Sequence, residues 1–188
     1  MIRKLLSSFV LLSALSSFVG SAAPWIMRVY ADEIVSQEYQ VKAAFLYNFA
    51  KFVKWPDDAR EKSEAFVIGI YGPDPFGNDI DELLKDEKID NRPVIVHRFK
   101  NLKSIDFCHV LFVTDERPQR LRELMVSLGD KNVLTVGQSE NFIENGGMIS
   151  FFIEDDKIRF EINKTATDKS KLQISSQLFK LARVVRGA

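Results

Sequence analysis

The side chains that could do chemistry in this 188-residue chain are few and far apart. Its two histidines, His97 and His109, lie in stretches that read as neighbouring strands, and Cys108 is its only cysteine. Two imidazoles can bind zinc, but no Cys-x-x-Cys or His-Glu-x-x-His spacing supports them. Cys108 also points to the opposite face of the strand from His109. The pattern favours structural histidines, a buried inert thiol, and neither a metal site nor another cofactor.

Two segments come close to catalytic loops but lack a decisive residue. Ser139 follows Gly137, yet the second glycine of a nucleophile elbow is missing, so we expect Ser139 to be a helix N-cap. Gly72 follows an apolar run, but Pro73 and Pro75 remove two donors that a phosphate loop would need. No catalytic residue is therefore assigned, and we expect no enzyme. A hydrolase would require Ser139 or a histidine to be essential.

Three polar residues stand near one predicted strand, residues 157–162. Arg159 and Glu161 share its polar face, where a surface ion pair is the simplest interpretation and a partner contact the alternative. Asn163 follows the strand and is expected to cap the short segment 164–169. Arg159, Glu161 and Asn163 are therefore candidate binding residues.

A second candidate region is the stretch VKAAFLYNFAKFVKWP, residues 41–56. Its large apolar residues fall along one broad side of a helix, which should end near Trp55 because Pro56 cannot continue it. Core packing explains this side, and the alternative is a partner or ligand groove that uses Asn48, Tyr47 and Trp55. Asn48 is the discriminating residue, because on an apolar flank its amide must find hydrogen bonds.

The elements that position these residues follow from hydrophobic periodicity. Strands are expected at residues 66–71, 93–99, 109–113, 133–136, 148–153 and 157–162. Helices are expected at 41–55, after Asp74 as N-cap with Pro75 at its first position, at 117–128, and at 175–186 with Ser175 as N-cap. The last two long strands are joined by three residues, so they must form an antiparallel hairpin. The fold class is therefore α/β, a single three-layer domain with a mixed, mostly parallel sheet that ends in an antiparallel hairpin and is flanked by helices.

The N-terminus has the order of a secretory signal. Arg3 and Lys4 precede an uncharged apolar run and the small residues Ser21, Ala22 and Ala23. Cleavage after Ala31 is preferred over cleavage after Ala23, because residues 24–30 have no evident place in a fold. We therefore expect residues 1–31 to be a signal peptide and residues 32–188 to be the domain; an uncleaved anchor is the alternative.

Composition limits the class of partner. Removal of residues 1–31 leaves 23 basic against 26 acidic residues, a balance that argues against nucleic acid. The lysines of residues 41–56 argue against a membrane span there, so no stable span is expected after signal cleavage.

Three segments together resemble one family. They are residues 41–56, then Gly147-Met148-Ile149 with residues 158–163, then residues 174–182. In this order they are similar to the YfiR/HmsC-like periplasmic proteins, and the resemblance spans essentially the whole expected domain.

The resemblance implies a bacterial periplasmic protein without catalytic activity. The best-understood members restrain an inner-membrane diguanylate cyclase by binding its periplasmic part, which keeps cyclic di-GMP and biofilm formation low, and they tend to be dimers. The single Cys108 departs from the disulfide-bonded members, so redox control through an internal disulfide is not expected here. The alternative function is a periplasmic sensor or solute-binding module coupled to another membrane signalling protein, such as a histidine kinase.

Overall fold

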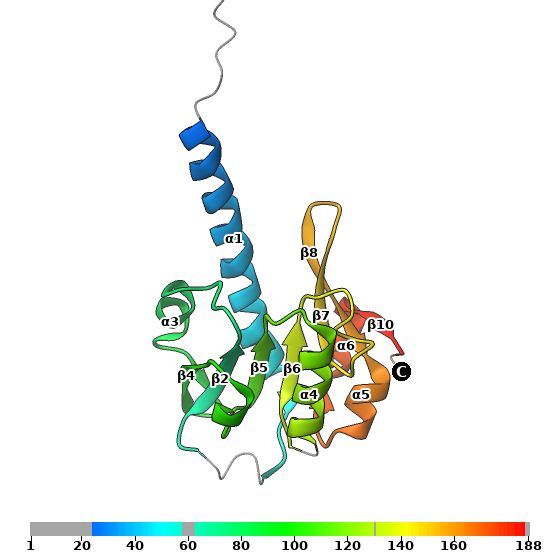
Figure 1. The fold of residues 1–188 in the computed structure, drawn as a ribbon. Helices are drawn as coiled ribbons and strands as arrows, with labels where there is room; N and C mark the ends of the chain where they lie inside the picture. Colours follow the sequence, from blue (N-terminus) through cyan, green and yellow to red (C-terminus); the bar gives the residue numbers. More distant parts are fainter. Residues whose placement is uncertain (1–23, 58–62, 130, 187–188) are drawn as a thin grey trace, which may run out of the picture. The chain divides into compact units, whose positions relative to one another are not determined.

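The computed structural model describes residues 24–57, 63–129 and 131–186 (Figure 1). By their contacts, the residues from Val35 onward form one compact unit, and those up to Ile34 form another. Most of the expected signal peptide lies outside the described residues, so its cleavage stays a prediction. Residues 24–30, for which the sequence suggested no place, are the first residues of helix α1 (Pro24–Lys51).

The fold is built on a mixed sheet of eight strands among the described residues, in the order β10-β8-β7-β6-β5-β2-β4-β3 (Figure 1). The pairs β4/β2, β2/β5, β5/β6, β6/β7 and β8/β10 are parallel, and β7/β8 and β3/β4 are antiparallel. This confirms the expected α/β fold with a mostly parallel sheet and an antiparallel hairpin. The strands are β2 (Phe66–Tyr71), β3 (Lys88–Ile89), β4 (Arg92–Phe99), β5 (Val110–Val113), β6 (Leu134–Gly137), β7 (Ile149–Glu154), β8 (Lys157–Asn163) and β10 (Arg183–Val185).

Helices cover both faces of this sheet. Buried residues of α1, α3 (Asp79–Leu84) and α6 (Ser176–Leu181) belong to one hydrophobic cluster, and those of α4 (Pro118–Leu128) belong to a second cluster on the opposite face. The described residues also include η1 (Leu102–Ser104), α5 (Lys164–Lys169) and a two-stranded antiparallel sheet of β1 (Val53–Lys54) and β9 (Gln173–Ile174). The three-layer arrangement follows from these two clusters.

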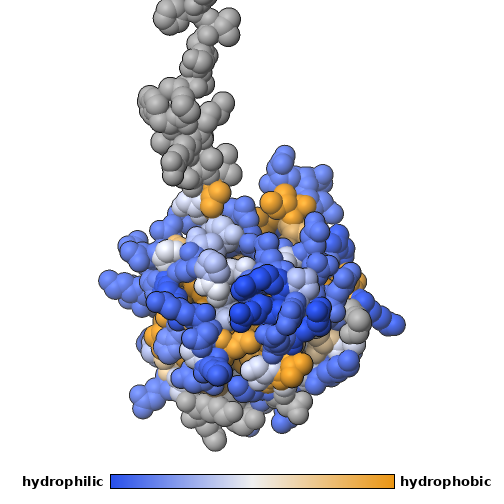
Figure 2. Space-filling model, viewed as in Figure 1, coloured by the Kyte–Doolittle hydropathy of each residue, from blue (hydrophilic) through white to orange (hydrophobic). Residues whose placement is uncertain are grey.

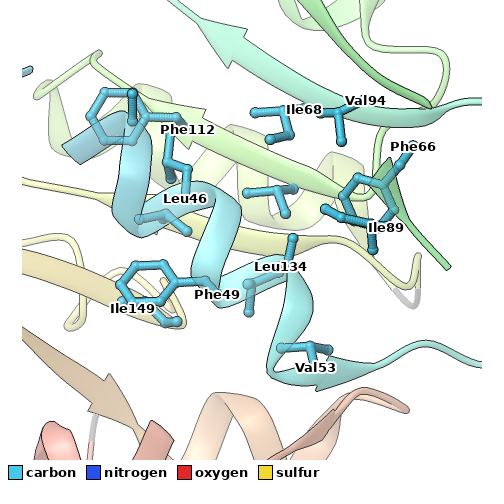
Figure 3. Packing of buried hydrophobic residues seen from close by; sticks show 14 of the residues in the cluster. Leu46, Phe49, Val53, Phe66, Ile68, Ile89, Val94, Phe112, Leu134 and Ile149 are labelled. Atoms are coloured by element: carbon cyan, nitrogen blue, oxygen red, sulfur yellow. The ribbon is translucent and has the colours of Figure 1, made fainter. Parts of the chain in front are cut away.

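The aromatic helix is buried as expected. Phe49 packs on Phe151 of β7 with ring centroids 5.6 Å apart and on Phe160 of β8 at 4.8 Å, and Leu46 lies beside it in the same cluster (Figure 3). Phe45 contacts the same two strand rings. The first helix is therefore attached mainly to the hairpin and the centre of the sheet.

Several helix boundaries differ from the expectation. The first helix ends at Lys51 rather than Trp55, because Val53 and Lys54 pair with β9. Asp74 is not an N-cap: its Oδ1 accepts from the backbone N–H of Phe76 at 2.8 Å in an Asx turn, and α3 starts only at Asp79.

The C-terminal helix is much shorter than the 175–186 range expected. Ser175 caps it as predicted, since its Oγ accepts from the backbone N–H of Leu178 at 3.2 Å, but the helix stops at Leu181. Residues Arg183–Val185 then pair with β8 as β10. Leu181, the last residue of this helix, is 70% exposed.

Candidate functional site

The β7–β8 hairpin carries the candidate residues Arg159 and Glu161. Beyond Ser150, β7 has no partner in β6, and β8 meets β10 only from Glu161 onward, so the distal hairpin extends past its neighbours (Figure 1). Asp155 and Asp156 form the tip, with φ of 51° and 56°. Apolar atoms are exposed just behind this hydrophilic tip, where Ile153 is 64% exposed (Figure 2).

One face of this hairpin is charged. Phe152 lies opposite Arg159, and Ser150 lies opposite Glu161, so these four side chains share a face. The guanidinium of Arg183 in β10 lies over the Phe152 ring, 3.9 Å from its centroid. We call the exposed Arg159 and Arg183, together with the partly buried Glu161 and Phe152, the charged hairpin face.

The expected ion pair between Arg159 and Glu161 is replaced by two other pairs. Arg159 Nε lies 3.5 Å from Glu154 Oε2, and Arg183 Nη2 lies 2.7 Å from Glu161 Oε2. Arg183 was missed from the sequence because it was assigned to a helix, which placed it far from Glu161. Since side chains of both arginines are about half exposed, these pairs add little stability and leave charge available for a partner.

Asn163 is a structural residue rather than part of that face. It is 1% exposed, and its Oδ1 accepts from the backbone N–H of Ala166 at 3.1 Å, which confirms it as the N-cap of α5. Its Nδ2 donates to the backbone oxygens of Ile143 at 3.2 Å and Gly147 at 3.0 Å. A partner has no access to this side chain.

Trp55 and Asn48 have different surroundings. Trp55 is 1% exposed; its Nε1 donates to the backbone oxygen of Ala50 at 3.1 Å, and its ring lies edge-on to Phe66. Asn48 is exposed and donates to the backbone oxygen of Ala44, one turn earlier in α1, at 2.9 Å. The structure therefore does not bring Trp55 and Asn48 together as a groove on the surface, and a binding role for Asn48 stays a prediction.

The two histidines lie apart. His97 is exposed on β4, whereas His109 is buried just before β5, and β2 separates these strands. His109 stacks on Phe66 with centroids 4.2 Å apart, and its Nδ1 accepts from the backbone N–H of Val67 at 3.0 Å. Cys108 packs in the second hydrophobic cluster, and burial raises the pKa of its thiol to about 12. The described residues contain no group of three or more His, Cys, Asp or Glu side chains that could hold a metal ion.

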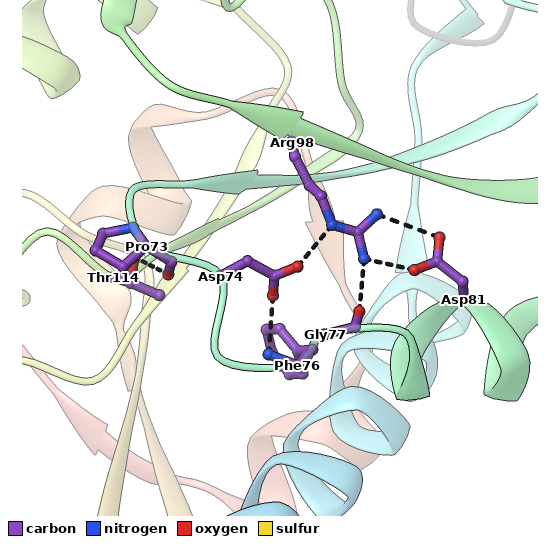
Figure 4. Close-up of polar contacts among 7 residues, drawn as sticks. All are labelled: Pro73, Asp74, Phe76, Gly77, Asp81, Arg98 and Thr114. Carbon is purple, nitrogen blue, oxygen red and sulfur yellow. Dashed lines mark hydrogen bonds and ion pairs between the residues drawn. The ribbon is translucent and has the colours of Figure 1, made fainter.

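The carboxyl ends of β2 and β5 are the place where open α/β sheets bind ligands, because the chain leaves these neighbours in opposite directions. Here Thr114 closes the gap: its Oγ1 donates to the backbone oxygen of Pro73 at 2.8 Å (Figure 4). Arg98 holds the next turn, with Nε 2.6 Å from Asp74 Oδ2 and further bonds to Asp81 and the backbone of Gly77. The hydrogen-bonding groups at this end of the sheet are therefore paired with one another, and we interpret this end as structural rather than as a ligand site.

A buried lysine was also missed as a core residue. Lys42 of α1 is buried, forms an ion pair with Glu38, and donates to Gln138 Oε1 at 2.9 Å beyond the end of β6. Ser139, the next residue, does not act as the expected N-cap: its Oγ is buried with no hydrogen-bond partner among the described residues. Within the described part of the chain no general base lies within hydrogen-bond distance of that hydroxyl.

Comparison with known proteins identifies the family of this chain. A family model described as YfiR/HmsC-like matches residues 39–183, well over half of the chain. The chain belongs to the YfiR/HmsC-like family. A search of curated proteins gave no match. Among the described residues no helix combines the length and apolar character needed to cross a bilayer.

The residues on which the family resemblance rests are mostly buried. Gly147 is one example: a Cβ at this position would lie 2.2 Å from Cδ1 of Phe142, so only glycine fits without a shift. Phe49, Trp55, Asn163 and Leu178 are likewise inside the fold. These residues lie in the interior of the fold, whereas the two arginines of the charged hairpin face are exposed.

Proposed function

We propose that this protein is a periplasmic, non-catalytic regulator that restrains an inner-membrane diguanylate cyclase and thereby lowers cyclic di-GMP and biofilm formation. The observation that carries the proposal is the family match over residues 39–183. The proposal includes export by residues 1–31, binding to the periplasmic part of the cyclase, and a homodimer as the working form.

The charged hairpin face is the proposed contact. It presents two arginine side chains, each about half exposed, beside a carboxylate and an aromatic ring. Arginine and aromatic side chains are enriched where protein partners bind tightly. The other sequence candidates contribute less, because Trp55 and Asn163 are buried.

Gene deletion tests the regulatory role. We expect cyclic di-GMP in the host to rise on deletion and to fall again when the wild-type gene is restored. The variant Arg159→Glu/Glu161→Lys should fail to restore the low level while keeping the wild-type melting temperature. Lys85→Glu/Asp86→Lys, on exposed residues outside the hairpin, is the matched control and should restore it. Unchanged cyclic di-GMP on deletion, with no cyclase co-purifying, would refute the regulatory role; full restoration by the hairpin variant would refute the contact site.

A second candidate function is a sensor or solute-binding module, and one cavity favours it. A space of about 310 Å³ opens before β5 and β6, with an apolar floor of Ile105, Leu128 and Val133, and with Lys131 and Asp106 among its polar residues. This volume is at the lower end of the range for small-molecule sites. A thermal-shift screen against nucleotides and amino acids tests it, since a ligand of the native state raises apparent stability. Because Cys108 also lines the cavity, a ligand bound there should slow alkylation of this single thiol.

A further inference from the structure

One edge of the large sheet is open. Among the described strands, β10 is the last in the order and pairs only with β8, from Arg183 opposite Glu161 to Val185 opposite Asn163. The preceding part of β8, Lys157–Phe160, pairs with β7 along one side, and its other side faces away from the sheet. Within the described part of the chain, no strand lies outside β10 or outside this part of β8. We call these two stretches the β10 edge.

The β10 edge also exposes apolar side chains. Val184 is 50% exposed and lies opposite the core residue Ile162, while Leu181 just before the strand is 70% exposed. Natural proteins usually protect a sheet edge with charge, a bulge or a covering element, because its free backbone groups can pair with another chain. Here the apolar residues stand on the strand itself and directly before it. This combination is typical of an edge that accepts an added strand.

The charge around β10 itself is of one sign, whereas the Lys157–Phe160 stretch follows the acidic hairpin tip. From residue 169 to residue 186 the chain carries Lys169, Lys171, Lys180, Arg183 and Arg186 and no acidic residue. Arg183 is paired with Glu161, but neither Lys180 nor Arg186 forms an ion pair with another described residue. A strand added at this edge would therefore lie beside uncompensated positive charge.

The opposite edge of the sheet, formed by β3, is also a terminal strand, but it differs in length, in exposed apolar residues and in charge. Its last strand, β3, has two residues, and Ile89 is buried rather than exposed. Its charge is mixed, with Asp86 and Glu87 before the strand, the exposed Lys88 within it and Asp90 after it. Only the β10 edge, of the two edges described, combines open backbone, exposed apolar residues and a basic surround.

A second copy of this chain is a poor occupant. Pairing two β10 strands would bring together two stretches whose charged residues are all basic. Like charges across paired strands are destabilising. An anionic membrane would satisfy the charge, but it offers no ordered hydrogen-bonding groups to the free backbone of a strand. An extended acidic segment satisfies both.

We propose that the β10 edge binds an extended segment of a partner protein in which acidic and apolar residues alternate, and that the segment adds to the sheet as a further strand. Its backbone pairs with the outer side of β10, its acidic side chains lie near Lys180 and Arg186, and its apolar side chains cover Val184 and Leu181. This binding mode is independent of the cyclase assignment above, because it is defined by the chemistry of the segment and not by the protein that carries it.

Synthetic peptides test the proposal on the purified protein expressed from its full-length gene. The probe is a fluorescent peptide of four Glu-Val repeats, measured by anisotropy at low salt. Two comparison peptides carry Lys in place of Glu, or N-methyl groups on alternate backbone nitrogens, which abolish strand pairing. We expect only the Glu-Val peptide to bind. Absence of binding up to about 1 mM peptide, the weak limit for specific recognition, or equal binding of either comparison peptide, overturns the proposal.

Charge reversal locates the site. Lys180→Glu/Arg186→Glu should weaken binding of the Glu-Val peptide about tenfold, since two exposed attractions become repulsions. Lys85→Glu/Lys88→Glu, near the β3 edge, should leave it within about twofold. Equal losses in both variants would show general electrostatic attraction and overturn the site. Unchanged melting temperatures by circular dichroism establish that each variant is folded.

Two further measurements test the two alternative occupants of the β10 edge, a second copy of this chain and an anionic membrane. Sedimentation velocity tests the second copy, and pelleting with phosphatidylglycerol vesicles tests the membrane. We expect neither self-association nor vesicle binding to change in Lys180→Glu/Arg186→Glu. Loss of a dimer in this variant would assign the β10 edge to a second copy, and loss of vesicle binding would assign it to the membrane; either result overturns the proposal.

Discussion

Replacing Asn163 distinguishes a structural role from a binding role for this residue. Its side-chain oxygen Oδ1 accepts from Ala166 N–H at 3.1 Å, and Nδ2 donates to the oxygens of Ile143 at 3.2 Å and Gly147 at 3.0 Å. These bonds join β8, helix α5 and the segment before β7. If the role of Asn163 is to make these hydrogen bonds, Asn163→Ala must lower the free energy of unfolding substantially.

The magnitude follows from the bonds lost. Loss of an N-cap costs about 1 kcal/mol. Each buried carbonyl left without its donor costs about another 1 kcal/mol. The sum is roughly 3 kcal/mol, or a fall in melting temperature of about 10 °C for a domain of this size. Asn163→Asp keeps the capping oxygen but replaces both donated bonds with repulsion between a carboxylate and two carbonyls, so we expect it to be at least as unstable at pH 7.

Urea and thermal denaturation followed by circular dichroism measure the effect. Asn141→Ala is the control, because this asparagine is exposed, and its replacement should change stability by less than about 0.5 kcal/mol. A loss below about 1 kcal/mol in Asn163→Ala would refute the structural explanation. If that variant also lost partner binding while remaining stable, Asn163 would return to the set of contact residues.

Three further predictions concern the core and two titrating groups. Phe49→Ala should lower the unfolding free energy by about 4 kcal/mol in urea titrations, because the ring is fully buried against Phe151 and Phe160; a loss below about 2 kcal/mol would contradict this packing. Cys108, whose thiol pKa is raised to about 12 by burial, should react with iodoacetamide at pH 8 about a thousandfold more slowly than a free cysteine, and unfolding in urea should restore the ordinary rate. Hydrogen bonds from Arg117 lower the pKa of the Asp115 carboxyl, so its stabilisation is present above the unfolded pKa near 4 and is lost as pH falls through the lowered folded value. Asp115→Asn should therefore be less stable than wild type at pH 7 in urea titrations, with the difference shrinking on acidification; a constant difference would contradict the assignment.

The long strands and the hairpin were predictable because their patterns are strong. In residues 157–162, apolar and charged residues alternate, and the structure forms β8 there with the apolar side in the core. The short strands β1, β3, β9 and β10 were not predictable, since two or three residues carry no measurable period. Their pairing depends on what lies beside them in space.

The C-terminal helix shows how tertiary contacts override a local pattern. Leu178, Leu181, Ala182 and Val185 have helical spacing, yet the helix ends after Leu181. The edge of β8 offers Arg183–Val185 backbone partners that a helix would not use, and it places Arg183 beside Glu161. The error had a functional consequence, because both the charged hairpin face and the β10 edge depend on this strand.

The candidate site was harder to predict than the fold because the sequence signal was mostly structural. The residues that carry the family resemblance include Trp55, Gly147 and Asn163, which fill the core, allow a close approach or satisfy buried backbone groups. Such residues make the YfiR/HmsC-like fold recognisable, but they do not report what binds to it.

Specificity for a partner must then come from residues outside that buried set. Arg159 and Arg183 are exposed within the matched range, whereas Arg186 lies beyond its end at residue 183. Surface charges of this kind can change without loss of the fold, because single exposed substitutions usually alter stability by less than about 0.5 kcal/mol. Two members of the family can therefore share their core and differ in partner. We propose that such a difference is encoded on the charged hairpin face and the β10 edge of this chain.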